Sequence, residues 1–396
     1  MPELAILTGS PAFTHPLHVG RPNIANQERF LERTGQILDR NWLTNNGPLV
    51  QEFEQRIAAI LAVKHCICVC NATIGLEIAI RAAGLKGEVI VPSYTFVATA
   101  HALQWQEITP VFADIDPATH TLDPTRIERH ITPRTTAILG THVWGRPCPV
   151  ESLVEIAQRR GLKLMFDAAP AFGCSHRGRM IGGFGLAEVF SFHATKFLNS
   201  FEGGAITTND DELAAKIRLM TNFGFSGYDN VIYIGTNGKM TEVSAAMGLT
   251  NLEGIEDLVA VNRRNYEAYR ACLTGIPGVA LMLYDIAERG NYQYVVVEVN
   301  EAAAGLTRDE LVKVLHAENV LARKYFWPGC HRMEPYRSLY PYAGMFLPET
   351  ERVAARVIVL PTGQTITVEI VSTICGIIRA AFAQSAAVRA ALSQRT

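Results

Sequence analysis

The stretch "LKLMFDAAPAFGCSHRGRMIGGFGLAEVFSFHATK", residues 162–196, contains two short apolar runs, each followed by a charged side chain. The first run, "LKLMFD", ends at Asp167, and the second, "EVFSFHA", comes shortly before Lys196. Runs of this length are typical of buried β-strands. Strands of one parallel sheet have their carboxyl ends at a common edge, where such sheets bind ligands. Asp167 and Lys196 are therefore the first candidates for a functional site.

The same pattern extends in both directions along the chain. Further short apolar runs predict strands at residues 65–70, 88–92, 109–116 and 135–143. Helical spacing of apolar residues predicts helices at 51–63, 73–84, 124–131 and 150–161. Short strands that alternate with helices predict an α/β fold with a mainly parallel sheet covered on both faces.

The predicted organisation has three parts. Residues 1–25 form an N-terminal segment, and the alternating pattern assigns residues 26–250 to a large domain. Residues 251–396 change in character, with "YQYVVVEVN" and later helical segments, and are expected to form a smaller α+β domain.

Composition limits the classes of partner. The chain has 396 residues, of which 48% are hydrophobic, so it can bury a large core. The formal net charge is −2 and the basic residues are scattered, which argues against nucleic acid or an anionic membrane as a partner. No basic start precedes an apolar stretch at the N-terminus, and apolar runs such as residues 370–378 are too short to span a membrane. We expect a cytoplasmic protein whose partners are small molecules or a second copy of itself.

Cysteine spacing favours core positions. In "HCICVC", Cys66, Cys68 and Cys70 alternate and so lie on one face of a strand, without the CxxC spacing of many metal sites. We interpret these three residues as reduced core thiols, with metal binding as the alternative, and expect no metal site.

A phosphate could bind where the strand "CICVC" meets a helix. Asn71, Ala72 and Thr73 lie at this junction, where free backbone N–H groups and the helix dipole favour an anion. The alternative is that Asn71 or Thr73 simply caps the helix. The segment lacks GxGxxG and GxxxxGK(S/T), so the sequence supports neither a dinucleotide fold nor a P-loop.

Asp167 and Lys196 each allow two interpretations. A carboxylate at the end of a strand either caps the strand or pairs with a buried cation such as a protonated pyridine nitrogen. A lysine usually extends to solvent, but in partly apolar surroundings its amine can form a Schiff base with an aldehyde. The pair Gly203-Gly204 would let the backbone pass close to a bound group.

Two further side chains complete the pattern. Phe96, which follows the strand "EVIVP", could stack on a flat heterocycle or pack in the core, and Ser191 could donate to a phosphate or be an ordinary strand serine. A phosphate seat, a carboxylate for a ring nitrogen, an aromatic face and an amine together describe a site for pyridoxal 5′-phosphate.

The chain resembles the nucleotide-sugar aminotransferases, which are pyridoxal-phosphate enzymes of the aspartate aminotransferase fold, called fold type I. The resemblance covers nearly the whole chain, and its most specific segments are "FDAAPAFGCSHRGRMIGGFG", "VFSFHATK", "EGGAITTND" and "NGKMTEVSAAMG". It implies a mainly parallel seven-stranded sheet between helices and a smaller α+β C-terminal domain.

The resemblance also implies roles for individual residues. Lys196 resembles the lysine that forms the Schiff base with the cofactor and then moves the proton, and Asp167 the partner of the pyridine nitrogen. Phe96 resembles the ring that stacks on the cofactor. The positions that match the phosphate-binding residues are Ala72, Thr73 and Ser191.

Two implied roles reach beyond the cofactor. Asn237, in "GTNGKMTE", matches an asparagine that reaches the phosphate from the other subunit, which implies a homodimer with shared active sites. His331, in "WPGCHRMEPY", falls in a region that faces the sugar substrate in this family.

Three positions depart from the family pattern. Pro170 stands where a Gln or His usually bonds the cofactor's 3′ oxygen, and proline has no side-chain donor. We consider His193 a candidate to replace that bond. Ala72 replaces a common glycine, and Lys239 replaces a common arginine, which keeps the charge but loses the fork geometry.

The segments "WLTNNGP", "FVATAHALQWQ" and "HVWGRPC" most resemble the branch that aminates C-4 of a dTDP-4-keto-6-deoxyglucose, with L-glutamate as donor, in deoxyaminosugar pathways of antibiotic and other natural-product biosynthesis. One alternative is amination at C-3. Another is a 3-dehydratase, which carries His where Lys196 stands. A third is a non-catalytic sugar-binding homologue, which only Pro170 supports.

Overall fold

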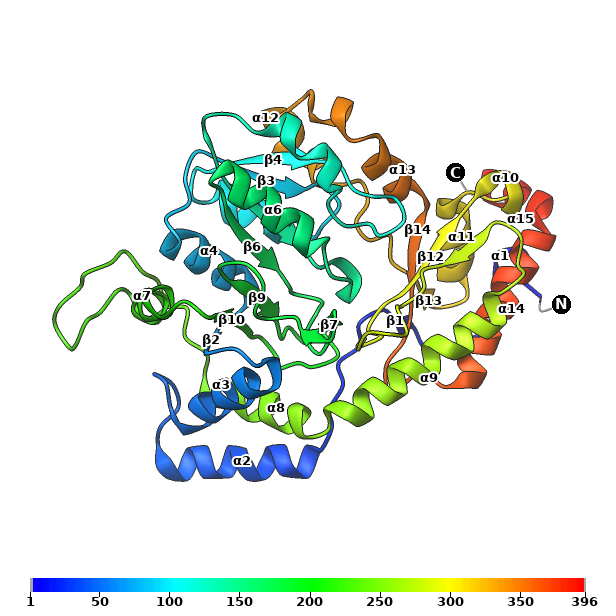
Figure 1. The fold of residues 1–396 in the computed structure, drawn as a ribbon. Helices are drawn as coiled ribbons and strands as arrows, with labels where there is room; N and C mark the ends of the chain where they lie inside the picture. The colour runs from blue at the N-terminus through cyan, green and yellow to red at the C-terminus, as the bar shows by residue number, and fades with distance from the viewer. Residues whose placement is uncertain (1–2, 395–396) are drawn as a thin grey trace.

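A seven-stranded sheet forms the centre of the computed structural model, which describes residues 3–394 (Figure 1). The strand order is β2-β10-β9-β6-β5-β3-β4. Their bounds are β2 (His65–Val69), β3 (Glu88–Pro92), β4 (Thr109–Ala113), β5 (Thr135–Thr141), β6 (Lys163–Asp167), β9 (Glu188–Ser191) and β10 (Gly204–Thr208).

Strand β10 is antiparallel to both its neighbours, whereas the paired strands from β9 to β4 are parallel. The predicted α/β class and the mainly parallel seven-stranded sheet are therefore confirmed. Strand-by-strand analysis of the sequence identified the other six strands but missed β10, which lies between β2 and β9.

Helices cover both faces of this sheet and bury two separate hydrophobic clusters. One face carries α4 (Ala72–Ala82), α5 (Ala98–Gln104) and α7 (Asp211–Thr221). The other carries α3 (Pro48–Leu61), α6 (Val150–Arg160) and α8 (Glu242–Glu253), with α2 (Gln27–Arg40) outside α8.

Alternation along β2 separates the two clusters. Cys66 and Cys68 lie in one cluster, and Ile67 and Val69 lie in the other, as expected for a strand with helices on both sides. Both thiols are free and buried, which confirms these two residues as core thiols. Among residues 3–394, no group of His, Cys, Asp or Glu side chains is arranged to hold a metal ion.

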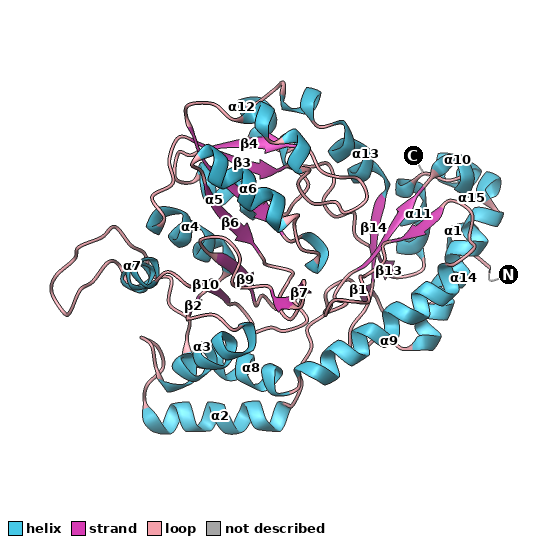
Figure 2. Cartoon of the chain, viewed as in Figure 1, coloured by secondary structure: helices cyan, strands magenta, loops and turns pink. Residues whose placement is uncertain are grey.

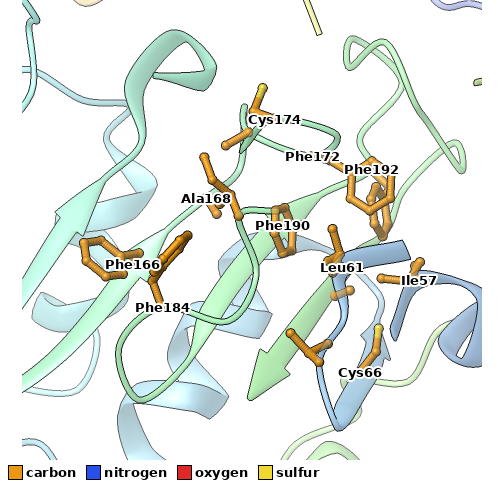
Figure 3. Packing of buried hydrophobic residues seen from close by; sticks show 14 of the residues in the cluster. Ile57, Leu61, Cys66, Phe166, Ala168, Phe172, Cys174, Phe184, Phe190 and Phe192 are labelled. Carbon is orange, nitrogen blue, oxygen red and sulfur yellow. The ribbon is translucent and has the colours of Figure 1, made fainter. Parts of the chain in front are cut away.

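Phenylalanine side chains pack around the ends of β6 and β9. Phe166 on β6 and Phe190 on β9 are fully buried, and Phe192 follows directly after β9 (Figure 3). Phe172 packs edge-on against both Phe190 and Phe192, with ring centroids 5.7 and 5.5 Å apart. This apolar layer fixes the ends of the strands that carry Asp167 and Ser191.

A second, three-stranded sheet of order β11-β12-β14 lies in the C-terminal part of the chain (Figure 2). Its strands are β11 (Val279–Leu281), β12 (Val295–Val299) and β14 (Val357–Leu360), and its main helices are α9 (Ile255–Leu273), α11 (Arg308–Ala317) and α14 (Val368–Ala383). The smaller elements of the chain are α1 (Ala5–Thr8), β7 (Ser175–His176), β8 (Arg179–Met180), α10 (Glu301–Ala304), α12 (Tyr336–Leu339), α13 (Pro348–Arg356) and α15 (Ser385–Ser393).

The described part of the N-terminal segment packs against this C-terminal sheet and its helices. Strand β1 (Leu17–His18) pairs in parallel with β13 (Val320–Leu321), and the backbone N–H of Ala5 donates to Glu318 Oε1 at 2.6 Å. Leu4 and Ile6 are part of the same hydrophobic cluster as β12 and α14. The division into residues 1–25, 26–250 and 251–396 remains a prediction.

Within residues 3–394, no single helix is long and apolar enough to cross a bilayer. Only α14 and α15 taken together reach that length and composition, and a bend of 84° separates them. The cytoplasmic location remains a prediction.

Candidate active site

The carboxylate of Asp167 is the buried polar group at the centre of the candidate site. It ends β6, is 4% exposed, and lies in register with Thr141 on β5 and Val189 on β9. Oδ2 accepts a hydrogen bond from Thr99 Oγ1 at 2.7 Å, and Oδ1 accepts from the backbone N–H of Ala169 at 3.0 Å.

Burial raises the pKa of the Asp167 carboxyl above its usual range, although Thr99, Ala169 and the nearby charge of Lys196 each lower it. Within residues 3–394, Asp167 forms no ion pair. A buried carboxylate in this state gains most from a cationic partner, because that partner would offset its desolvation.

A chain of threonine hydroxyls supports the carboxylate. Thr141 donates to Thr95 at 3.3 Å, and Thr95 and Thr99 share a hydrogen bond of 2.9 Å. All three side chains are buried, so their hydroxyls depend on one another for partners. This chain holds the Thr99 hydroxyl in place, and Thr99 in turn fixes the Asp167 carboxylate.

Lys196 lies in the irregular segment that follows β9. Its backbone N–H donates to the carbonyl of His193 at 2.8 Å, and the side chain is partly buried. Nζ donates a hydrogen bond of 3.2 Å to the hydroxyl of Tyr294, which precedes β12. The lysine is therefore held between the large sheet and the C-terminal part of the chain.

Two of the three predicted phosphate-binding residues, Ser191 and Ala72, lie next to Gly204. In the sheet, Gly204 pairs with Ser191 on one side and with Val69 on the other, and β2 leads from Val69 into helix α4. A Cβ at Gly204 would lie 2.9 Å from the backbone nitrogen of Ala72. The glycine therefore lets Ser191 and the start of α4 approach each other.

Helix α4 begins at Ala72. The side chain of Asn71 caps this helix by accepting from the N–H of Ile74 at 2.9 Å, which confirms the capping alternative for Asn71. Ala72 and Thr73 are the first two helical residues, and their N–H groups have no acceptor within the helix. These N–H groups and the helix dipole suit an anion beside Ser191.

Phe96 lies in the turn between β3 and α5 and is 60% exposed. Its carbonyl accepts from the N–H of Thr99 at 3.1 Å, so the turn that carries the ring also carries the Asp167 donor. An exposed ring one turn from Thr99, the donor to Asp167, is available to stack on a planar ligand.

Asn237 and Lys239 lie near the end of residues 222–241, a segment that projects beyond α7 and then returns to the sheet, where Lys239 bridges Val69 of β2 (Figure 1). Asn237 is exposed and pairs by its backbone with Asn222, and the amine of Lys239 donates to the side chain of Asn222 at 2.8 Å. Within the described chain, no hydrogen bond or ion pair joins Asn237 to Lys196 or Asp167. A role in another subunit's site remains a prediction.

His331 is buried at 2% exposure, with a protein partner at each ring nitrogen. Nδ1 lies 2.7 Å from Ser93 Oγ, and Nε2 lies 3.2 Å from Glu351 Oε1. Burial lowers the pKa of the imidazole, although Glu351 raises it. Since Ser93 follows β3, the bond to His331 connects the C-terminal part of the chain to the end of this strand. Contact of His331 with a sugar remains a prediction.

Pro170 and His193 have separate contacts, and replacement of the missing donor by His193 remains a prediction. The carbonyl of Pro170 accepts from the side-chain amide of Asn291 at 2.9 Å. The exposed ring of His193 instead bonds Thr195 at 2.8 Å and lies 3.5 Å from Glu202.

Two residues that contact the candidate site residues were not identified from the sequence. Thr99 bonds Asp167, and Tyr294 bonds Lys196. Thr99 lies near the start of a helix, where threonine is commonly a structural residue. Tyr294 is distant in sequence from Lys196, and a tyrosine next to a strand usually packs in a core. For Thr99, its position one turn after Phe96 was a usable signal.

The fold and this site define a fold type I aminotransferase, in which a sheet edge presents a buried carboxylate, a lysine amine and an anion seat. The chain belongs to the DegT/DnrJ/EryC1/StrS aminotransferase family, which matches residues 25–379.

Individual relatives agree with this assignment. The chain is 37% identical over 364 residues to a dTDP-4-amino-4,6-dideoxy-D-glucose transaminase of Shigella dysenteriae, covering 92% of this chain and 98% of the relative. It is 36% identical to a GDP-perosamine synthase of Caulobacter vibrioides, covering 82% and 87%. The crystal structure of DesI in the presence of its TDP-sugar product superimposes with a TM-score of 0.94, at 49% identity and with 99% of each chain covered.

Proposed function

We propose that this protein uses pyridoxal 5′-phosphate to move an amino group from L-glutamate to C-4 of a dTDP-4-keto-6-deoxyhexose. The products would be a dTDP-4-amino-4,6-dideoxy sugar and 2-oxoglutarate. The observation that carries the proposal is the buried carboxylate of Asp167, which lacks a cationic partner in the described chain and lies near the amine of Lys196. The names of the Shigella relative and of the DesI structure support a TDP-sugar and C-4.

The residues present suit the ring nitrogen and the phosphate of the cofactor, whereas Pro170 offers no side-chain donor to the 3′ oxygen. Asp167 suits a protonated ring nitrogen, and Ser191 with the N–H groups of Ala72 and Thr73 suits the phosphate. The close approach at Gly204 leaves no room for a side chain there, as a backbone cradle for a bound group requires. The exposed ring of Phe96 suits one face of the heterocycle.

When bound, pyridoxal phosphate supplies an aldehyde that carries the amino group and a ring that accepts electrons. Asp167 holds the proton on the ring nitrogen, because loss of that proton would leave the carboxylate buried and unpaired. Lys196 Nζ removes the proton from the α-carbon of glutamate in the first half of the reaction. In the second half, Lys196 Nζ delivers a proton to C-4 of the sugar.

A homodimer with shared sites is part of the proposal. Residues 222–241 include exposed apolar side chains, among them Tyr228 at 97% and Ile234 at 74%. An exposed apolar segment of this kind suits burial against a second subunit. Mixing Lys196→Ala subunits with Asn237→Ala subunits would test the sharing, because only mixed dimers would contain one intact site.

Absorbance and product analysis test the function. The purified protein is expected to be yellow, and its absorbance should shift when L-glutamate is added. The protein is then supplied with 3-keto and 4-keto dTDP sugars, and with a GDP-linked 4-keto sugar, and products are identified by mass spectrometry and NMR. If amination occurred only at C-3, or only on the GDP-linked sugar, the proposed substrate would be wrong. A colourless protein without turnover would favour the non-catalytic alternative.

A further inference from the structure

The amine of Lys196 has a protein partner from the C-terminal part of the chain. Nζ lies 3.2 Å from the hydroxyl of Tyr294 and 5.8 Å from the centre of its ring. Among residues 3–394, this is the one hydrogen bond that Nζ forms. The lysine is otherwise attached only through its flexible four-carbon stem, which has many rotamers.

Tyr294 is held firmly enough to direct that stem. Its ring packs edge-on against Trp144, with centroids 5.3 Å apart and an interplanar angle of 68°. The hydroxyl of Tyr284 accepts from the backbone N–H of Tyr294 at 3.3 Å and donates to its carbonyl at 3.1 Å. Both the ring and the backbone of Tyr294 are thus fixed.

Trp144 is itself held in an unusual conformation. Its φ is +63°, in the left-handed region that bulky residues rarely adopt, and the side chain is 1% exposed. It stacks on Phe326, with ring centroids 5.2 Å apart. Conformations of this kind persist only where the surrounding packing imposes them, and they cluster at functional sites.

A hydroxyl is suited to an amine that changes its charge. The tyrosine oxygen can accept from the ammonium form of Lys196, and its O–H can donate to the neutral amine. Tyr325 also lies near the charge of Lys196, but its hydroxyl forms no hydrogen bond with Nζ in the described chain. Tyr294 is therefore the group that can accompany Nζ through both protonation states.

We propose that Tyr294 is a positioning residue for Lys196, whose hydroxyl directs Nζ. The inference rests on the proposed function of Lys196. Without the hydroxyl, Nζ would lose its one hydrogen bond among residues 3–394, and the lysine stem would be free to adopt other rotamers.

The test measures the reactivity of Lys196 in the full-length, cofactor-free protein. Wild-type and Tyr294→Phe proteins are labelled with trace acetic anhydride, and peptide mass spectrometry compares Lys196 with the exposed Lys86 as an internal reference. Near neutral pH, we expect Tyr294→Phe to label Lys196 about threefold to tenfold faster, because its amine is no longer held in a hydrogen bond. In the loaded enzyme, kcat should fall about tenfold with little change in KM for either substrate.

Tyr325→Phe is the matched control. Tyr325 lies close enough to Lys196 to feel its charge, but it forms no hydrogen bond with Nζ in the described chain. Its removal should leave the labelling of Lys196 unchanged. Equal labelling in wild-type and Tyr294→Phe proteins, or an equal increase in Tyr325→Phe, would overturn the inference. The labelling needs no turnover, so failure of the proposed function would be seen separately, as absence of the amino sugar in the wild-type assay.

Discussion

Asp167 and Lys196 face the same site but are held in different ways. Asp167 ends a central strand and is fixed by Thr99 and Ala169, both from the same large sheet and its connections. Lys196 lies in an irregular segment, and its amine is directed by Tyr294 from the C-terminal part of the chain. The carboxylate of Asp167, which stays in place, is thus part of the sheet. The amine of Lys196, which must move in the proposed reaction, depends on the packing of two distant parts of the chain.

The largest effect is expected on the lysine side. Lys196→Ala should reduce turnover by about 10⁴-fold or more, because among residues 3–394 Lys196 is the lysine whose charge acts on Asp167. Anaerobic absorbance spectra and product assays check this, and Lys196→Arg is the control that keeps a positive charge without the same nucleophile. Amino-sugar formation by Lys196→Ala would remove the lysine from its proposed role.

The second effect tests the carboxylate side. Asp167→Asn keeps the shape and one of the two acceptor oxygens but removes the charge, so kcat should fall about 10²- to 10³-fold, as for other losses of electrostatic stabilisation. Assays of kcat with L-glutamate and the keto sugar measure this. If kcat were unchanged, a charged partner for the ring nitrogen would be unnecessary.

The same substitution has a pH signature in stability. Burial raises the pKa of Asp167 in the folded chain, so the wild type loses stability as pH rises from the unfolded to the folded pKa, while the Asn variant does not. Thermal unfolding of both cofactor-free proteins across acidic to neutral pH should therefore show the wild type falling relative to Asp167→Asn. A constant difference in Tm would contradict the raised pKa.

A smaller effect is expected where the sheet approaches α4. In Gly204→Ala, the new Cβ would lie 2.7 Å from the carbonyl of Phe190 and 2.9 Å from the nitrogen of Ala72, so the anion seat must shift. We expect the Kd for pyridoxal phosphate to rise about tenfold, as overpacking commonly costs 1–3 kcal/mol. Gly35→Ala is the control, since a Cβ there meets nothing within 4 Å. Unchanged affinity in Gly204→Ala would argue against a phosphate at this position.

The smallest effect should come from Thr99→Val, which preserves shape and removes the hydroxyl that donates to Asp167 at 2.7 Å. Loss of this bond raises the pKa of Asp167 further and should lower kcat about threefold to tenfold. Thr95→Val is the comparison, because Thr95 bonds Thr99 and not Asp167. A larger kcat loss in Thr95→Val than in Thr99→Val would show that the carboxylate is not held in the way described.

The difference between Asp167 and Lys196 also explains which parts of the candidate site could be predicted from the sequence. Asp167 ends an apolar run, so a local pattern located the end of β6, whereas the run "EVFSFHA" continues past Ser191, where β9 ends. Strand β10, "GAITT", was missed because the pair Gly203-Gly204 at its start was interpreted only as space for a ligand, although its β-branched residues favour a strand.

Contacts between distant residues could not be predicted from local patterns. The bond between Lys196 and Tyr294 depends on how the C-terminal part of the chain packs against the large sheet. The pairing of β1 with β13 involves two residues on each strand, which is too short to produce a periodic signal.

That terminal pairing has a consequence for folding during synthesis. Ala5 and its partner Glu318 are 313 positions apart, and the chain grows at about 5–20 residues per second on the ribosome. Leu4 and Ile6 are therefore synthesised roughly 15 to 60 seconds before the C-terminal residues that bury them. During that interval the large sheet can form, and the C-terminal part of the chain packs against the N-terminal segment last.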